Sequence, residues 1–180
     1  MTNFPIEITL TLIPNSDQFS KIAVAMPSCK SFFDGQQVGS NINDNCWESD
    51  GYRFHDILHL GLFAEFGWSP VLLKMMKLKN TNDRKIYEFE EGPRAVCADE
   101  GICLLVFNYA KERSFDIKDE NLSEIILAIK SISYGLLSLD HSCGDWSNFI
   151  HNSIAVVQKI KSQNGGTIIA NRINKTLITV

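Results

Sequence analysis

The segment YRFHDILHLGLFAEFGWSP, residues 52–70, carries the clearest helical pattern of the chain. Phe54, Leu58 and Phe63 recur at helical spacings, and the apolar residues between them widen the stripe. A pattern of this kind is typical of a helix that is buried over most of its surface. We therefore expect a largely buried helix over Tyr52–Phe66.

Helix start and stop signals divide the region that follows. Gly67 ends the first helix, and Ser69 and Pro70 supply the N-cap and the first residue of a second helix. Lysines near the end of that second helix complement its dipole. We expect about five helices in all, of which the second to the fifth span about Pro70–Lys79, Pro93–Lys111, Glu120–Leu139 and Asp145–Ser162.

The first 45 residues show strand and loop patterns. Apolar and polar residues alternate over Ile6–Leu12, the period of a half-buried strand. Lys21–Met26 is a second candidate strand. Asp34–Asp50 is polar and rich in turn residues, so we expect it to lie on the surface as a loop.

The C-terminal segment has the pattern of a β-hairpin. Gly165-Gly166 forms a turn, and Thr167–Ala170 and Thr176–Val180 are its two strands. The sequence contains no repeat or linker, so we expect a single α+β domain with a mainly helical core. Its expected parts are the strand and loop region at 1–45, the helical core at 51–162 and the hairpin at 163–180.

Length and composition exclude several classes of protein. The chain has 180 residues, 44% hydrophobic and 21% charged, which is the balance of an ordinary globular protein. The net charge of −4 argues against DNA binding through a broad basic face. No apolar run is long enough to span a membrane, and no signal peptide is recognisable. The five cysteines include no CxxC pair, so we expect reduced thiols in a cytoplasmic protein that binds neither DNA nor membranes.

The first candidate site is the sequence HDILH, residues 55–59. On a helix, His55 and His59 are four residues apart and point the same way, so both imidazoles can bind one metal ion. Asp56 points elsewhere and is a candidate ligand, hydrogen-bond partner or base. The alternative is a satisfied polar network that fixes the packing of the helix.

The second candidate site is an acidic run that leads into the third expected helix. It contains Glu88, Glu90, Glu91, Asp99 and Glu100. Grouped carboxylates provide the hard oxygen ligands that Mg²⁺ and Mn²⁺ prefer, so we expect one of these two ions rather than Zn²⁺. We expect Glu91 and Glu100 to join His55 and His59 as metal ligands, and Asp56 and Glu100 to be catalytic.

Basic residues near these acids suit a phosphate-bearing substrate. Between residues 71 and 86 there are five Lys or Arg side chains against one Asp. We expect Arg53, Arg94, Lys74 and Lys77 to contact substrate phosphates.

The same segments resemble a known family. Tyr52–Pro70, together with Glu90–Gly101, is similar to the C-terminal domain of MazG-like nucleotide pyrophosphohydrolase proteins, and the similarity extends over about residues 40–180. The polar positions of the shared motif are His55, Asp56, His59, Glu91, Arg94 and Glu100. The helical N-terminal catalytic module of that family, with its ExxE-type acidic pattern, has no counterpart before residue 40, so the resemblance implies a stand-alone accessory domain.

Three functions remain open from the sequence. The first is a metal-dependent phosphohydrolase that acts on nucleotides. The second is a non-catalytic module of a bacterial stress or phage-defence system, which binds a nucleotide, a partner protein or a second copy of itself. The third is a zinc peptidase, because residues 55–59 have the form of HExxH with Asp in place of Glu.

Overall fold

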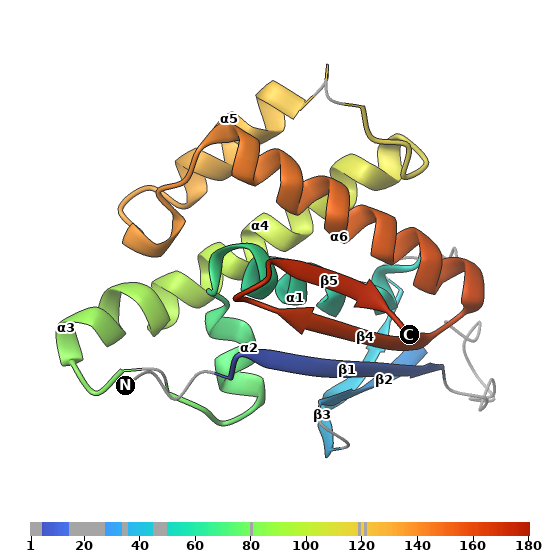
Figure 1. Ribbon diagram of the computed structural model, residues 1–180, viewed down its shortest axis with the longest axis horizontal. Coiled ribbons are helices and arrows are strands. Elements are labelled where there is room, and N and C mark those ends of the chain that lie inside the picture. The colour runs from blue at the N-terminus through green and yellow to red at the C-terminus, as the bar shows by residue number, and fades with distance from the viewer. Residues whose placement is uncertain are drawn as a thin grey trace, which may run out of the picture.

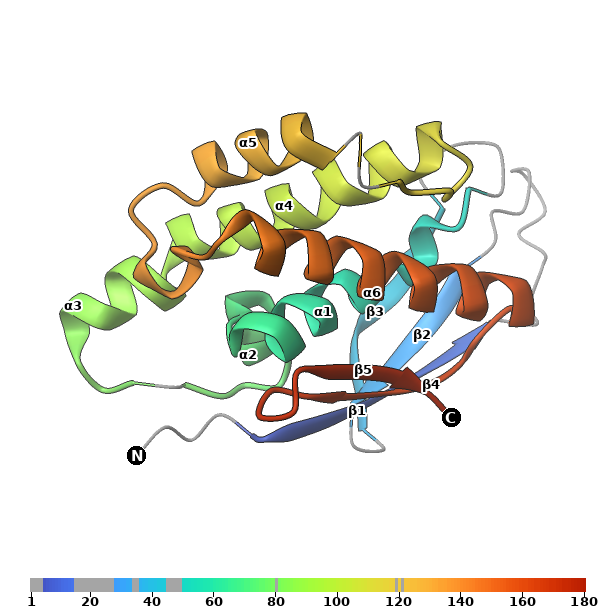
Figure 2. The same cartoon turned by 45° about the horizontal axis from the view of Figure 1, so that its top comes forward.

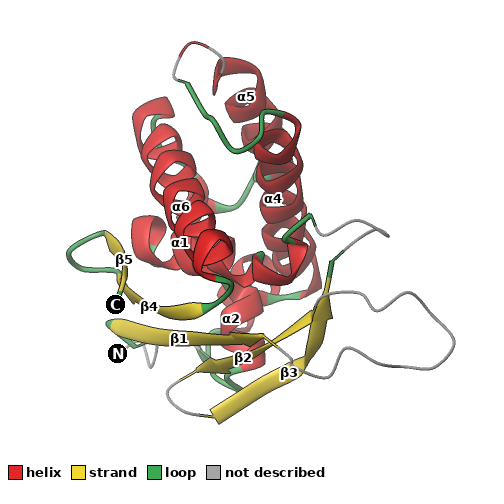
Figure 3. Cartoon of the chain, turned by 90° about the vertical axis from the view of Figure 1, so that its right-hand side faces the viewer, coloured by secondary structure: helices red, strands yellow, loops and turns green. Residues whose placement is uncertain are grey.

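The computed structural model describes residues 5–14, 28–33, 36–44, 50–79, 81–118, 120 and 122–180. It is an α+β structure in which an antiparallel sheet lies beneath a layer of helices (Figure 1). Figure 3 shows these helices on one side of the sheet. The expected fold class, a mainly helical core with N-terminal strands and a C-terminal hairpin, is confirmed.

The sheet joins the two ends of the sequence. Its strand order is β3-β2-β1-β4-β5, so β1 lies between β2 and β4. The bounds are β1 Glu7–Pro14, β2 Ser28–Phe33, β3 Gln36–Asn43, β4 Gly166–Asn171 and β5 Thr176–Thr179. The expected hairpin at the C-terminus is therefore β4 and β5, and it extends the N-terminal sheet.

The pairing of β1 with β4 buries one face of both strands. Leu10 is opposite Ile168 and Ile8 is opposite Ala170, and all four side chains are buried under the helices. On the other face Thr11 is opposite Thr167, and their hydroxyl oxygens are 3.1 Å apart. The alternation over residues 6–12 thus reflects one buried and one accessible face of the sheet.

One expectation for the N-terminal region is wrong, and another cannot be placed. Asp34–Asp50 was expected to be a surface loop, but β3 occupies Gln36–Asn43 and pairs with β2. The segment has few apolar residues because β3 is an edge strand, and such strands are often polar. The candidate strand Lys21–Met26 lies outside the described residues.

Among the described residues, longer helices and short helical segments connect the strands. The longer ones are α1 Asp56–Phe66, α2 Pro70–Met75, α4 Pro93–Glu112, α5 Leu122–Ile132 and α6 Cys143–Gln163. The short ones are the 3₁₀ turns η1 Tyr52–Phe54 and η4 Leu137–Leu139, the single turn α3 Arg84–Ile86 and the π-helical turn η2 Tyr87–Glu91. None of the described helices is long and apolar enough to cross a membrane.

Three helix boundaries differ from the expectation by more than two residues. Helix α1 begins at Asp56 rather than Tyr52, and residues 52–54 form the 3₁₀ turn η1. The helix expected over 120–139 ends at Ile132, because Gly135 adopts a left-handed conformation (φ +81°) and the chain turns into η4. The second helix ends at Met75 rather than Lys79, because Lys77 also has a positive φ. Lys77 therefore follows α2 instead of lying on it.

Helix α1 is the centre of the packing. It contacts α6, α4 and α2 as well as strands β4 and β5, and Figure 2 shows it between the sheet and the longer helices. Phe54, Leu58 and Phe63 are fully buried, as the pattern over residues 52–66 predicted. A helix enclosed on all sides explains why its polar residues lie inside the protein.

Candidate metal centre

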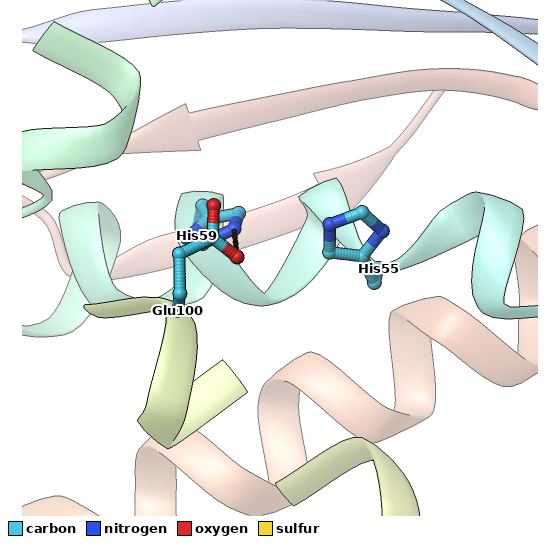
Figure 4. Close-up of side chains that lie close together, drawn as sticks. All are labelled: His55, His59 and Glu100. Atoms are coloured by element: carbon cyan, nitrogen blue, oxygen red, sulfur yellow. Dashed lines mark ion pairs between the residues drawn. The ribbon is translucent and has the colours of Figure 1, made fainter. Parts of the chain in front are cut away.

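The candidate site lies where α1 meets α4. His55 is the residue before the first turn of α1, His59 is one turn further on, and Glu100 belongs to the second turn of α4. Figure 4 shows the two imidazoles next to each other on α1 and the Glu100 carboxylate reaching toward His59. The i, i+4 spacing brings the histidines together as expected, with ring centroids 5.7 Å apart.

The three side chains form a compact donor group. One potential ligand atom of each of His55, His59 and Glu100 lies within 4.8 Å of the others. His59 Nε2 and Glu100 Oε2 are 3.6 Å apart, which is longer than a hydrogen bond. The side chain of His59 is 0% exposed, that of His55 is 13% exposed and that of Glu100 is 47% exposed. The group is therefore anchored in the core and accessible from the side of Glu100.

Both imidazoles are held through their Nδ1 atoms. His59 Nδ1 is 2.7 Å from Asp99 Oδ1, and His55 Nδ1 is 3.0 Å from the carbonyl oxygen of Tyr52. The Tyr52 ring also stacks on His55, with centroids 4.3 Å apart and an interplanar angle of 5°. Metal-binding histidines are commonly held by a carboxylate or carbonyl in this way.

The other nitrogen of His59 is the unusual atom of the site. Within the described part of the chain, His59 Nε2 is buried and has no hydrogen-bond partner. Buried polar atoms are nearly always satisfied, because an unpaired one destabilises the fold by about 1–3 kcal/mol. A cation between His59, His55 and Glu100 would satisfy Nε2, so the residues present fit a metal ion.

The protonation states differ between the two histidines. Burial lowers the pKa of His55, against the opposing effect of Asp56, so its imidazole is neutral at pH 7. Burial also acts to lower the pKa of His59, but the Asp99 carboxylate in contact with Nδ1 opposes burial, and the pKa lies above the usual value. His59 therefore gives up a proton when its Nε2 coordinates a cation. The adjacent His59 imidazole lowers the pKa of Glu100, against the effect of burial, which keeps this carboxylate ionised.

A second group of potential ligands consists of His59, Asp99 and Cys103, all buried. Burial raises the pKa of the Cys103 thiol to about 12, so it stays protonated at neutral pH. Its Sγ lies 3.3 Å from His59 Nδ1 and 3.7 Å from Asp99 Oδ1. Because these atoms already face one another, this group is an internal polar network rather than a metal site.

Two expected acidic residues lie outside both groups. Asp56 is buried, and its Oδ1 is 3.7 Å from His55 Nε2. Glu91 is buried at the end of η2, just before α4 begins. Neither completes a three-residue donor group in the described structure. Their roles as base and as metal ligand stay predictions.

The four expected phosphate-binding residues lie at separate places. Arg53 is buried, and its guanidinium group donates to Asp44 and Asn164. Arg94, at the start of α4, donates to the carbonyl oxygen of Tyr134. Lys74 is exposed near the end of α2, and Lys77 is exposed just beyond it. Their contacts with phosphate likewise stay predictions.

The sequence placed Asp99 in the acidic run without a specific role, and it gave no role to Tyr52. Asp99 and Glu100 are adjacent acids on one helix, and nothing in the sequence distinguishes the buried one from the accessible one. The sequence did contain a signal for Tyr52, because it lies three residues before His55. At the start of a helix this spacing lets the Tyr52 carbonyl oxygen contact Nδ1 of His55.

The fold and the site together define an α+β protein with a His–His–Glu group between the buried helix α1 and the partly exposed helix α4. The family model for the MazG C-terminal domain matches residues 3–180, so the chain belongs to the MazG C-terminal domain family. Comparison with curated proteins and with solved structures gave no match.

Proposed function

We propose that the protein is a metal-dependent hydrolase of nucleoside phosphates, with a divalent cation held by His55, His59 and Glu100. The observation that carries the proposal is the buried, unpartnered His59 Nε2 beside a second imidazole and a partly exposed carboxylate. Membership of the MazG C-terminal domain family supports the class of substrate. The bound cation would polarise a phosphoryl oxygen and lower the pKa of a coordinated water.

The donor set favours one type of cation. Two imidazole nitrogens and one carboxylate oxygen suit transition metals such as Mn²⁺ and Zn²⁺ better than Mg²⁺, which prefers oxygen ligands. Of the two ions expected from the sequence, we therefore propose Mn²⁺.

The chain's own side chains have separate roles in this proposal. His55 and His59 would bind the cation from the buried side and fix its position, and Glu100 would bind it from the accessible side. Asp56, next to His55, would accept the proton of the attacking water. Lys74 and Arg94 would attract the phosphates electrostatically.

The test is hydrolysis of a panel of nucleoside triphosphates with Mn²⁺ or Mg²⁺, measured as release of phosphate or pyrophosphate. We expect Mn²⁺-dependent turnover in the wild type and a loss of about 100-fold or more in Glu100→Gln. Glu112→Gln is the matched control, because Glu112 is an exposed carboxylate at the far end of the same helix.

Two outcomes would contradict the proposal. Equal rates in the wild type and Glu100→Gln would exclude the site as the source of activity. Nucleotide-dependent stabilisation without turnover would instead favour a non-catalytic nucleotide-binding module.

A further inference from the structure

We propose that Asp99 is a positioning residue that forces the metal-binding nitrogen of His59 to be Nε2. The inference rests on the proposed function, because it explains how the cation site is prepared. Asp99 does not belong to the His55, His59 and Glu100 group itself. It lies behind His59, on the side away from Glu100.

Each oxygen of Asp99 faces a different element. Asp99 is 0% exposed, and its Oδ1 is 2.7 Å from His59 Nδ1 on α1. Its Oδ2 accepts hydrogen bonds from Ser69 Oγ at 2.7 Å and from the backbone N–H of Val71 at 3.0 Å, both at the start of α2. The carboxylate therefore ties α1, α2 and α4 together at one point.

The contact with His59 decides which imidazole nitrogen carries a hydrogen. An ionised carboxylate only accepts hydrogen bonds, so the hydrogen between Asp99 and His59 must be on Nδ1. A neutral imidazole carries one N–H, and the other nitrogen then has a free lone pair. When His59 gives up a proton to bind a cation, the nitrogen left with the free lone pair is Nε2, the buried atom beside Glu100 and His55.

Helix α2 prevents Asp99 from turning away. The Ser69 hydroxyl donates to Asp99 and accepts from the backbone N–H of Leu72 at 3.3 Å, so it is also the N-cap of α2. The N–H of Val71 is one of the first-turn groups that have no partner within a helix. Two donors at Oδ2 thus leave Oδ1 in place for His59.

Asp99→Asn is the decisive variant, because it keeps the shape, removes the charge and replaces one acceptor oxygen with a donor NH₂ group. The amide oxygen should take the place of Oδ2, since two donors meet there, and the NH₂ group then faces His59 Nδ1. Because this NH₂ group donates to Nδ1, the hydrogen of the neutral imidazole must be on Nε2. A hydrogen on Nε2 blocks the binding of a cation there. Glu112→Gln is the matched control, because it removes the charge of an exposed carboxylate at the far end of the same helix and leaves the contact between Asp99 and His59 intact.

The experiment is calorimetric titration of the full chain with Mn²⁺, alongside thermal unfolding of each variant. We expect Asp99→Asn to bind Mn²⁺ about 10–100-fold more weakly, because His59 loses the carboxylate that orients it. The variant should still unfold cooperatively. Glu112→Gln should bind Mn²⁺ within about threefold of the wild type, because Glu112 lies outside the contacts of Asp99 and His59. His59→Ala should abolish binding.

A second measurement needs no variant. Nitrogen NMR of the wild type with Zn²⁺ should show Nδ1 of His59 still protonated and Nε2 bound to the metal. Wild-type Mn²⁺ affinity in Asp99→Asn, or a His59 coordinated through Nδ1, would overturn the role of Asp99 and leave the metal site standing. Absence of Mn²⁺ and Zn²⁺ binding by the wild type would instead overturn the proposed function, and the role of Asp99 with it.

Discussion

At the scale of single residues, Cys103 shows how strongly the environment around His59 controls chemical reactivity. Its thiol is fully buried and lies against the imidazole of His59 and the carboxylate of Asp99. Burial raises its pKa to about 12. Since the thiolate is the nucleophile, Cys103 is an inert packing residue at neutral pH.

We expect Cys103 to resist alkylation by iodoacetamide at pH 8 in the folded protein. With a pKa of about 12, only about one thiol in 10⁴ is ionised at that pH. Cys97 and Cys143 are exposed, so both should be modified much faster. Peptide mapping by mass spectrometry gives the three rates, and denaturation in urea should make them equal. Labelling of Cys103 at the rate of Cys97 in the native state would show that the site opens.

The sequence predicted part of the site because that part depends on local spacing. His55 and His59 lie on one helix, and their separation alone places them together. The separate roles of Asp99 and Glu100 depend on how α4 packs against α1 and α2. Nothing in their neighbouring residues contains that information.

At the scale of elements, the close contact of α1 with α6 depends on a glycine. A Cβ atom at Gly61 would lie 1.9 Å from Ser153 Oγ and 3.0 Å from Phe149 Cε2, both on α6. Small residues let helices approach each other, and this approach brings α6 over the helix that carries the two histidines. Gly101 on α4 provides a comparison, because a Cβ there would meet only Ile132 Cγ2, at 3.8 Å.

We expect Gly61→Ala to be less stable than Gly101→Ala by about 1–3 kcal/mol, because inserting a methyl group into a filled contact strains the packing. Both variants gain the same helix propensity, about 1 kcal/mol, so the difference isolates the steric effect. Urea denaturation measures both free energies of unfolding. Adding Ser153→Ala to Gly61→Ala should recover part of the loss, and no recovery would contradict a clash at Ser153 Oγ.

Helix boundaries were harder to predict than helix positions. The buried stripe of α1 and the N-cap at Ser69 follow from local patterns, and both are confirmed. The predicted end of α5 was wrong because the apolar pattern continues past Gly135 to Leu136 and Leu139. These two side chains are buried, but they belong to a short 3₁₀ turn and its flank instead of a helix. Apolar periodicity records burial, and a short 3₁₀ turn can satisfy the same pattern.

At the scale of the whole molecule, β1 is an interior strand of the sheet and a wall of the helical core. Leu10 on β1 is fully buried in the same cluster as Phe63 of α1 and Trp146 of α6. Ile13, on the same strand, is 48% exposed. The first strand therefore supports helices that are far away in the sequence.

We expect Leu10→Ala to lower the free energy of unfolding by about 2–5 kcal/mol through loss of apolar contact and the cavity left behind. Ile13→Ala should change it by less than about 0.5 kcal/mol, because that side chain is half outside the protein. Chemical denaturation followed by Trp fluorescence gives both values. Equal effects of the two substitutions would mean that β1 is not part of the cooperative core.

The existence of β1, β4 and β5 could be predicted from the sequence, but that of β2 and β3 and the order of the strands could not. The alternation over residues 6–12 and the turn at Gly165-Gly166 are local patterns. The pairing of Leu12 with Gly166 joins positions at opposite ends of the chain, and only the shared burial of both strands under the helices selects it. A polar edge strand such as β3 leaves almost no pattern.

The place of β1 between β2 and β4 also has a consequence for how the protein is made. During synthesis, β1 leaves the ribosome long before its neighbour β4, since Leu12 pairs with Gly166. At 5–20 residues per second, translation of the intervening chain takes roughly 8–30 s. For that time the apolar face of β1 lacks its C-terminal partner, so a nascent chain stalled before β4 should be the form most prone to aggregation and to chaperone capture.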